Sequence, residues 1–115
     1  MLAAANRLRT RTDFSDVVRR GRRASRPLLT VHLLLAEPGS APLPPRAGLV
    51  VSKAVGGSVV RHQVARRLRH VLRAALSAVP PGARLVVRAA PAAASADSAA
   101  LAADLATTLD RLVHR

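Results

Sequence analysis

The stretch VGGSVVRHQVARRLRHVLR, residues 55–73, is the most informative part of the chain. It opens on Gly56 and Gly57, passes a potential N-cap at Ser58, and continues to about Val79 without glycine or proline. Its apolar residues recur at spacings of three and four, the period of one helix face: Val60, Val64, Leu68, Val71, Leu72, Ala75, Leu76 and Val79. The stretch therefore predicts an amphipathic helix whose apolar side packs against a sheet.

The opposite side of this predicted helix is strongly basic. Four residues fall in one stripe away from the apolar face: His62, Arg66, Arg69 and Arg73. Arg61 lies in the first turn, and no acidic residue occurs between Ser58 and Val79. A solvated helix face usually mixes charges of both signs in i,i+4 pairs. The uncompensated charge therefore favours contact with an external polyanion over a merely solvated face.

The composition supports the same interpretation. The 115 residues, predicted to form a single domain over 1–115, contain 19 basic and 6 acidic side chains, for a net charge of +13. Nucleic acid is the favoured partner, ahead of an anionic membrane surface, because the chain has no Trp or Tyr to anchor an interfacial helix. The absence of cysteine excludes disulfides and thiolate metal sites. Without an apolar membrane span or a signal-peptide core, the protein is expected in the cytoplasm.

Around the basic helix, the patterns predict an α+β protein with a small mixed β-sheet packed with helices, in the order α-β-β-α-β-α. A basic arm at about 1–11 leads to a short helix capped by Thr12 and ended by Gly21. Strands are expected at 28–35, at 48–53, antiparallel to the first, and at 84–90. The last helix starts near Ser95 or Asp97.

Residues for protein-based catalysis are sparse. Asp13 and Asp16 share a helix face, but helix capping explains them better than a metal site. The four histidines are scattered without zinc-ligand spacing, and the glycine pair is too sparse for a phosphate-binding loop. We therefore predict no catalytic and no metal-binding side chain in this chain.

At these residues the chain resembles the protein component of bacterial ribonuclease P. The family's signature is a strand ending in Ser-Lys, a Gly-rich turn and a helix of the Arg-Asn-Arg type. It corresponds here to segments 46–53, 55–56, 59–62 and 66–69. The first helix of the family resembles the stretch from Arg7 to Arg22, with Asp13 and Phe14, and its last strand resembles 84–89 before Pro91. The similarity covers roughly residues 6–113.

The resemblance implies a function. In this family the protein binds a catalytic RNA and the 5′ leader of precursor tRNA, and the RNA removes the leader endonucleolytically with bound Mg²⁺. The expected partners are thus ribonuclease P RNA and precursor tRNA, and the protein alone is expected to be inactive. The implied fold is ribosomal protein S5 domain 2-like, with a left-handed βαβ crossover where a right-handed one is the rule. A ribosomal or other structural RNA-binding protein without processing activity is the alternative.

The resemblance also implies site residues. Contact with the RNA is expected from Ser52, Lys53, Arg61, His62, Arg66, Arg67, Arg69 and Arg73. A leader-binding cleft between the first helix and the sheet is expected from Arg7, Arg11, Phe14, Val18 and Val31. Phe14 is the only aromatic residue, so it either stacks on a leader base or anchors the first helix in the core. The chain departs from the family motif at Ala54, Gly57, His62, Gln63 and Ala65.

Overall fold

A computed structural model describes residues 2–114. Four strands form one sheet: β1 (Arg22–Arg26), β2 (Leu29–Leu34), β3 (Arg46–Val50) and β4 (Arg84–Ala89). The α-helices are α1 (Arg11–Arg20), α2 (Ser58–Ala75) and α3 (Ser98–Val113). Three short 3₁₀ turns complete the structure: η1 (Ala4–Asn6), η2 (Leu76–Ala78) and η3 (Pro91–Ser95). The predicted α+β class is confirmed, and the sheet has one strand more than the sequence patterns indicated.

The additional strand is β1, which directly follows α1 in a segment where no strand was predicted. Its sequence RRASR contains one apolar residue, Ala24, which is buried. β1 pairs only with β2 and forms one edge of the sheet, so most of its side chains stay in solvent. An edge strand rich in arginine has no apolar alternation to detect, and its charges discourage pairing with another chain.

The strand order in the sheet is β1-β2-β4-β3. β2 is antiparallel to both of its neighbours, β1 and β4, whereas β3 is parallel to β4. The predicted opposite directions of β2 and β3 are correct, but the two strands are not adjacent because β4 lies between them. The chain therefore leaves β3 at one edge, passes through α2, and returns as an inner strand.

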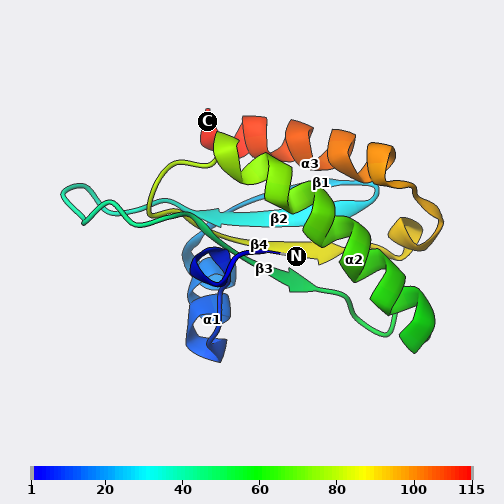
Figure 1. Cartoon of the computed structure of the whole chain (residues 1–115). Coiled ribbons are helices and arrows are strands. Elements are labelled where there is room, and N and C mark those ends of the chain that lie inside the picture. The colour runs from blue at the N-terminus through cyan, green and yellow to red at the C-terminus, as the bar shows by residue number, and fades with distance from the viewer. Residues whose placement is uncertain (1, 115) are drawn as a thin grey trace.

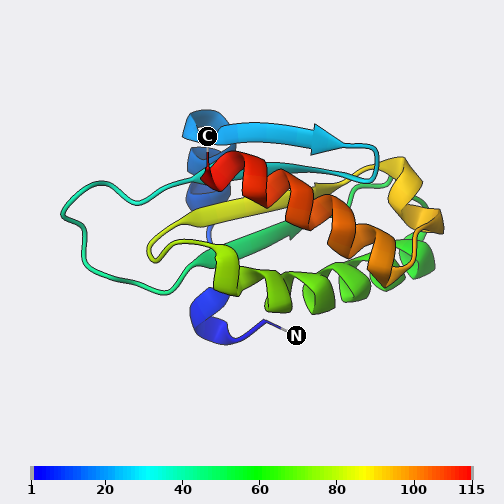
Figure 2. The same ribbon diagram turned by 90° about the horizontal axis from the view of Figure 1, so that it is seen from above.

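This β3-α2-β4 connection is left-handed. In Figure 2, β3 and β4 both run to the right, β4 lies above β3, and α2 lies on the viewer's side of the sheet. A right-handed crossover would place β4 on the other side of β3. The crossover implied by the family resemblance is confirmed, although nothing in the periodicity of the chain indicates it.

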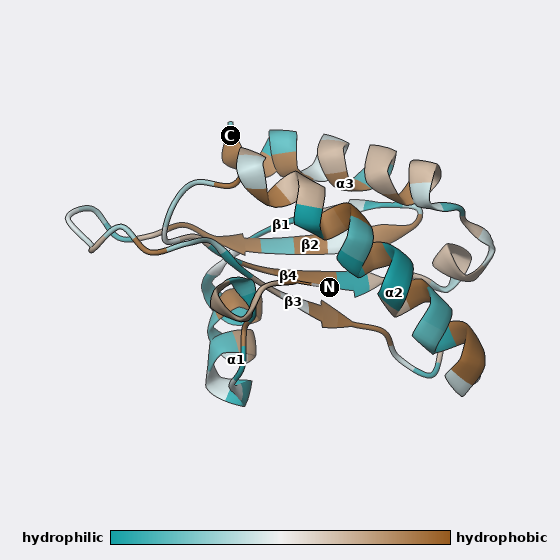
Figure 3. Ribbon diagram, viewed as in Figure 1, coloured by the Kyte–Doolittle hydropathy of each residue, from teal (hydrophilic) through white to brown (hydrophobic). Residues whose placement is uncertain are grey.

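The helices divide between the two faces of the sheet. α2 and α3 cover one face, and α1 lies on the other face toward one end of the strands (Figure 1). Beneath α2 and α3, the large buried core contains Leu29, Val31, Leu33, Leu68, Leu72, Leu85, Val87, Leu101, Leu105 and Leu112. A smaller cluster beneath α1 contains Leu8, Val17 and Val86. Figure 3 shows hydrophilic and hydrophobic residues alternating along α2, and the buried ones are Val64, Leu68, Val71 and Leu72.

Gly21 ends α1 and Asp97 caps α3 as predicted, whereas the start of α1 and both ends of α2 differ from the predicted ones by one to four residues. α1 begins after Thr10, whose hydroxyl accepts a hydrogen bond from the Asp13 N–H at 3.0 Å, so the predicted cap at Thr12 is wrong. Gly57 is the N-cap of α2, and Ser58 is its first helical residue. α2 ends at Ala75, ahead of η2. For α3, Asp97 is the cap and accepts from the Ala100 N–H at 2.8 Å.

The N-terminal segment crosses the free edge of β3 from one face of the sheet to the other. Leu2 is buried in the core beneath α2, whereas Leu8 belongs to the cluster beneath α1. Between them Arg7 pairs with Ala47 of β3 in a parallel bridge, and the Leu8 N–H donates to the Ala47 carbonyl oxygen at 3.0 Å. The segment predicted as a basic arm is therefore packed from Leu2 onward. Within residues 2–114, no helix is both long and apolar enough to cross a membrane.

Candidate RNA interface

The outer side of α2 presents the predicted stripe to solvent. His62, Arg66, Arg69 and Arg73 are all exposed. Val64, Leu68, Val71 and Leu72 are buried on the opposite side. Because α2 contains no acidic residue and none of these arginines pairs with a carboxylate of residues 2–114, the charge of the stripe is uncompensated.

Arg67 differs from its neighbours on α2. It is partly buried, and its Nη1 donates to the carbonyl oxygen of Ala96 at 3.2 Å. This bond ties α2 to the segment that precedes α3. Arg67 was expected to contact RNA because of its place in the family motif. In the structure it makes a contact within the protein, so we do not count it with the exposed stripe.

The entry to α2 adds further groups to this side of the molecule. Ser52 and Lys53 are exposed in the turn that follows β3, and the Val55 N–H donates to the Ser52 carbonyl oxygen at 3.1 Å. Arg61, in the first turn of α2, is partly buried, and its Nε is buried without a hydrogen-bond partner among the described residues. Gly57 caps α2 without a side-chain hydrogen bond, so the first backbone N–H groups stay available to an anion.

On the opposite side of the molecule, the α1 face of the sheet forms three rows of side chains across the strands. The row beneath α1 contains Leu34, Arg84 and Arg46. The middle row contains Arg23, His32, Val86 and Gly48. The outer row contains Ser25, Thr30, Arg88 and Val50. Ser25 and Arg88 are exposed and Thr30 and Val50 are half-buried, so the outer row is an open sheet surface beside α1.

Ion pairs fasten α1 over the first of these rows. Asp13 accepts a hydrogen bond from Arg84 Nη1 at 2.9 Å and lies 3.7 Å from Arg46 Nη1. Asp16 lies 3.7 Å from the same Arg84 nitrogen. The two carboxylates are thus engaged by guanidinium groups, and they do not fit a magnesium site. Among residues 2–114, no group of three or more His, Asp or Glu side chains is arranged to hold a metal ion.

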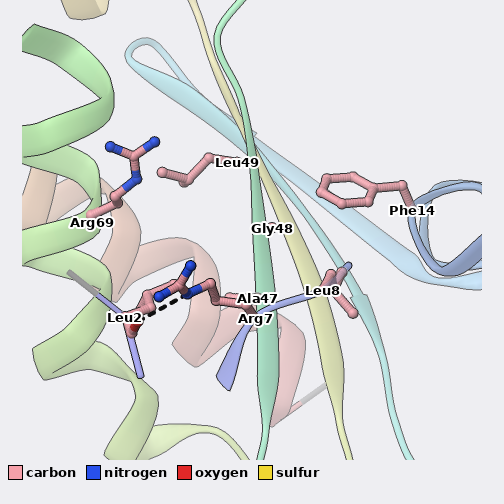
Figure 4. Close-up of a pocket in the computed structure, with 8 residues that line it drawn as sticks. All are labelled: Leu2, Arg7, Leu8, Phe14, Ala47, Gly48, Leu49 and Arg69. Carbon is pink, nitrogen blue, oxygen red and sulfur yellow. Dashed lines mark hydrogen bonds between the residues drawn. The ribbon is translucent and has the colours of Figure 1, made fainter. Parts of the chain in front are cut away.

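Phe14 joins α1 to β3. A Cβ atom on Gly48 would lie 2.2 Å from the ring carbon Cζ of Phe14, so the ring packs directly on the glycine backbone. A groove of ≈ 320 Å³ curves around the β3 edge at this point (Figure 4). Phe14 and Leu8 line it on the α1 side, and Arg69 lines it on the α2 side. Phe14 is half-buried, so it both anchors α1 and presents part of its surface to the groove.

The remaining cleft residues are not all brought together. Val18 and Arg11 are exposed on α1, but Arg7 points to the α2 side of β3, where its Nε donates to the Leu2 carbonyl oxygen at 3.0 Å (Figure 4). Val31 is completely buried in the core beneath α2 and α3, so its inclusion in the cleft is wrong. Successive residues of a strand face opposite sides of the sheet, so the next residue of β2, His32, lies on the α1 face.

His32 is the functional candidate that sequence reasoning missed. It is 7% exposed, and Nδ1 is buried without a hydrogen-bond partner among the described residues. Burial lowers its pKa below the ordinary 6.5, and the nearby positive charges of Arg23 and Arg88 lower it further. The alternation of β2 carries the signal that could have revealed it, because Leu29, Val31 and Leu33 mark the opposite face.

A basic helix on one face and an open, arginine-bearing sheet on the other define an RNA-binding α+β protein. Comparison with known proteins supplies the family. The ribonuclease P family model matches residues 2–113. The ribonuclease P protein component of Streptomyces bikiniensis is 58% identical over 118 residues, covering 98% of this chain and 96% of the relative. That of a Nocardioides species is 54% identical over 112 residues, covering 97% and 95%.

Solved structures agree on the fold. The RNase P protein of Staphylococcus aureus superposes with a TM-score of 0.77 at 21% identity, covering 92% of this chain and 94% of that one. The Thermotoga maritima protein gives a TM-score of 0.74 at 24% identity, covering 92% and 96%. The chain belongs to the ribonuclease P protein family. It is accordingly a protein subunit of the ribonucleoprotein endonuclease that processes the 5′ ends of tRNA, and a purely structural RNA-binding role is not favoured.

Proposed function

We propose that the exposed stripe of α2 binds the ribonuclease P RNA, together with Arg61 and the Ser52-Lys53 turn. We propose further that the α1 side of the sheet holds the single-stranded 5′ leader of precursor tRNA. The stripe and the sheet surface lie on different faces of the molecule, so one protein can contact the catalytic RNA and the substrate at the same time.

One observation carries this proposal: the exposed basic groups of the α2 stripe and of the open sheet surface lack acidic partners among residues 2–114. The stripe on α2 has no carboxylate on its own helix. On the sheet, Arg23 and Arg88 form no salt bridge with residues 2–114, whereas Arg46 and Arg84 of the same face pair with Asp13. The residues that fasten α1 are neutralised, and those on the open surface are not. Phosphate groups of RNA would supply the missing negative charge.

The chemistry of leader removal is assigned to the RNA, with magnesium held by that RNA. Bound magnesium supplies activation of water and stabilisation of the leaving oxygen. The side chains of this protein bind and orient the RNA. Arginines hold backbone phosphates, and the edge of Phe14 offers an aromatic surface to a base. We infer further that the protein acts in the cytoplasm, where a bacterial precursor tRNA would be processed.

Reconstitution tests the proposal. The cognate RNA with the protein should cleave precursor tRNA, and the protein alone should not. Replacing Arg88 by Gln should weaken binding of precursor tRNA to the holoenzyme about five- to thirtyfold, the loss of roughly 1–2 kcal/mol from one charged phosphate contact. Binding of mature tRNA, which has no leader, should stay unchanged. The matched control is Arg111→Gln, which removes an exposed charge from α3. Equal losses for both tRNAs would contradict a leader site on this face.

Phe14→Leu tests the aromatic contribution. The change keeps most of the apolar volume and removes the flat ring, so stacking and packing can be separated. We expect precursor binding to weaken tenfold or less, the low end of the roughly 1–3 kcal/mol for stacking on one base. Equal losses of affinity for precursor and mature tRNA, with a lower melting temperature, would show that Phe14 packs on Gly48 and does not contact the leader.

A further inference from the structure

His32 lies at the centre of a positively charged sheet surface. On β1 the residue directly opposite is Arg23, and on β4 Arg88 is the diagonal neighbour through its pairing with Thr30. Side chains on one sheet face lie about 5 Å apart when opposite and about 7–8 Å apart when diagonal. Both guanidinium groups can therefore reach an anion placed over His32.

The other charged groups of this face are already paired. Arg84, two residues before Val86 on β4, binds Asp13 and Asp16 of α1. Arg46 of β3 pairs with Asp13. Val86, the β4 residue opposite His32, is apolar. The charges that face His32 without carboxylate partners among residues 2–114 are therefore Arg23 from β1 and Arg88 from β4.

Two structural features of the free protein disfavour protonation of His32. Protonation would place an N–H on Nδ1, which is buried and has no acceptor among the described residues. It would also add a third positive charge between two arginines. Anything that neutralises the arginines removes the second penalty, and a phosphate between Arg23 and Arg88 does so directly.

We propose that His32 takes up a proton when a leader phosphate binds between Arg23 and Arg88, so that the preference for precursor over mature tRNA strengthens as the pH falls. The inference rests on the proposed leader site. No bond is made or broken: the proton comes from solvent and stays on the imidazole while the leader is bound. His32 thereby becomes a third cationic contact to the phosphate, available only in the bound state.

The direction follows from linkage. If leader binding raises the affinity of His32 for a proton, a proton must raise the affinity for the leader by the same factor. The pKa of His32 in the free protein lies below 6.5, and the proposal requires it to be higher in the complex. The preference for precursor tRNA should therefore be constant at high pH. It should grow as the pH falls through the pKa of the complex and level off below that of the free protein.

The first test measures the affinity of the holoenzyme for precursor and for mature tRNA from pH 5.5 to pH 8, in roughly half-unit steps within the range where histidine titrates. The ratio of the two affinities cancels effects on the catalytic RNA and on the tRNA body. We expect this ratio to rise by up to about tenfold per pH unit, the limit for one proton. His32→Asn, which cannot titrate, should give a flat ratio. The control His114→Asn removes an exposed histidine at the end of α3 and should leave the pH dependence intact.

A second measurement needs no variant. The NMR titration of the His32 ring in the whole protein should shift to a higher midpoint when a short single-stranded RNA with the leader sequence is added. An identical midpoint with and without the RNA would overturn the proton uptake. A precursor preference that is present at every pH but independent of pH would overturn it too, while leaving the leader site in place. Absence of any preference at all pH values would instead overturn the leader site itself.

Discussion

The ring of Phe14 packs against the backbone of Gly48, with no room for a Cβ atom between α1 and β3. Two segments separated by more than thirty residues thus meet at a contact that requires one aromatic and one glycine. The same contact forms part of the groove at the β3 edge. The position of α1, and with it the wall of the proposed leader site, therefore depends on a residue with no side chain.

Replacing Gly48 by Ala should displace the Phe14 ring, because the new methyl group would overlap Cζ and Cε1 of the ring. Overpacking of this kind costs about 1–3 kcal/mol of the free energy of unfolding. In the double variant Gly48→Ala/Phe14→Leu the smaller side chain should relieve the overlap, so its loss should be less than the sum of the single losses. Denaturant unfolding of the three variants measures this coupling, and strict additivity would argue against the contact.

The stripe on α2 should control the salt dependence of RNA binding. Replacing Arg66 and Arg69 by Gln should reduce the slope of log affinity for the catalytic RNA against log salt by about 1.4–1.8, because each phosphate contact contributes about 0.7–0.9. The melting temperature should change little, since both side chains are exposed.

Arg67→Gln is the matched control on the same helix. Because Arg67 donates to Ala96, its replacement should lower the melting temperature and leave the salt slope nearly unchanged. The opposite result would be a reduced slope for Arg67→Gln and an unchanged slope for the Arg66→Gln/Arg69→Gln double variant. It would mean that the RNA contacts a different side of α2.

Changing Asp13 and Asp16 together to Asn should destabilise the protein without affecting the chemical step. Both carboxylates contact Arg84, a partly buried guanidinium that would lose its counter-charges. We expect a loss of about 1–3 kcal/mol in the free energy of unfolding, the usual cost of leaving a partly buried polar group unpaired. Single-turnover cleavage at saturating protein should remain within a few-fold of the wild type. A loss of several orders of magnitude, with fold and binding intact, would reveal a metal site in the protein.

The free energy of unfolding of the free protein should depend on the protonation of His32 at acidic pH. Folding lowers the pKa of His32 below 6.5, so the unfolded chain binds the proton first as the pH falls. The His32 contribution is therefore constant above about pH 7 and destabilises the folded state progressively below pH 6.5. Urea unfolding of the wild type and of His32→Asn should give a stability difference that changes in this window. A pH-independent difference would show that His32 titrates alike in both states.

Sequence alone determined the components of this protein. The spacing of Val64, Leu68, Val71 and Leu72 defined α2, since a helix with one apolar side must bury that side. The charge of its other side required no tertiary information, because residues on one helix are placed by its 3.6-residue period. The motif around Ser52 and Lys53 indicated the family, and the family model and the relatives confirm it.

Tertiary structure decided which of these components meet. The family resemblance implied the left-handed crossover, but the local pattern did not, because handedness depends on which side of β3 the strand β4 is placed, relative to the sheet face that α2 covers. Strand pairing separated Val31 from His32 by placing them on opposite faces of β2. It also set His32 opposite Arg23 and diagonal to Arg88. A side chain's neighbours across a sheet follow from strand order and register, which no single segment of the chain contains.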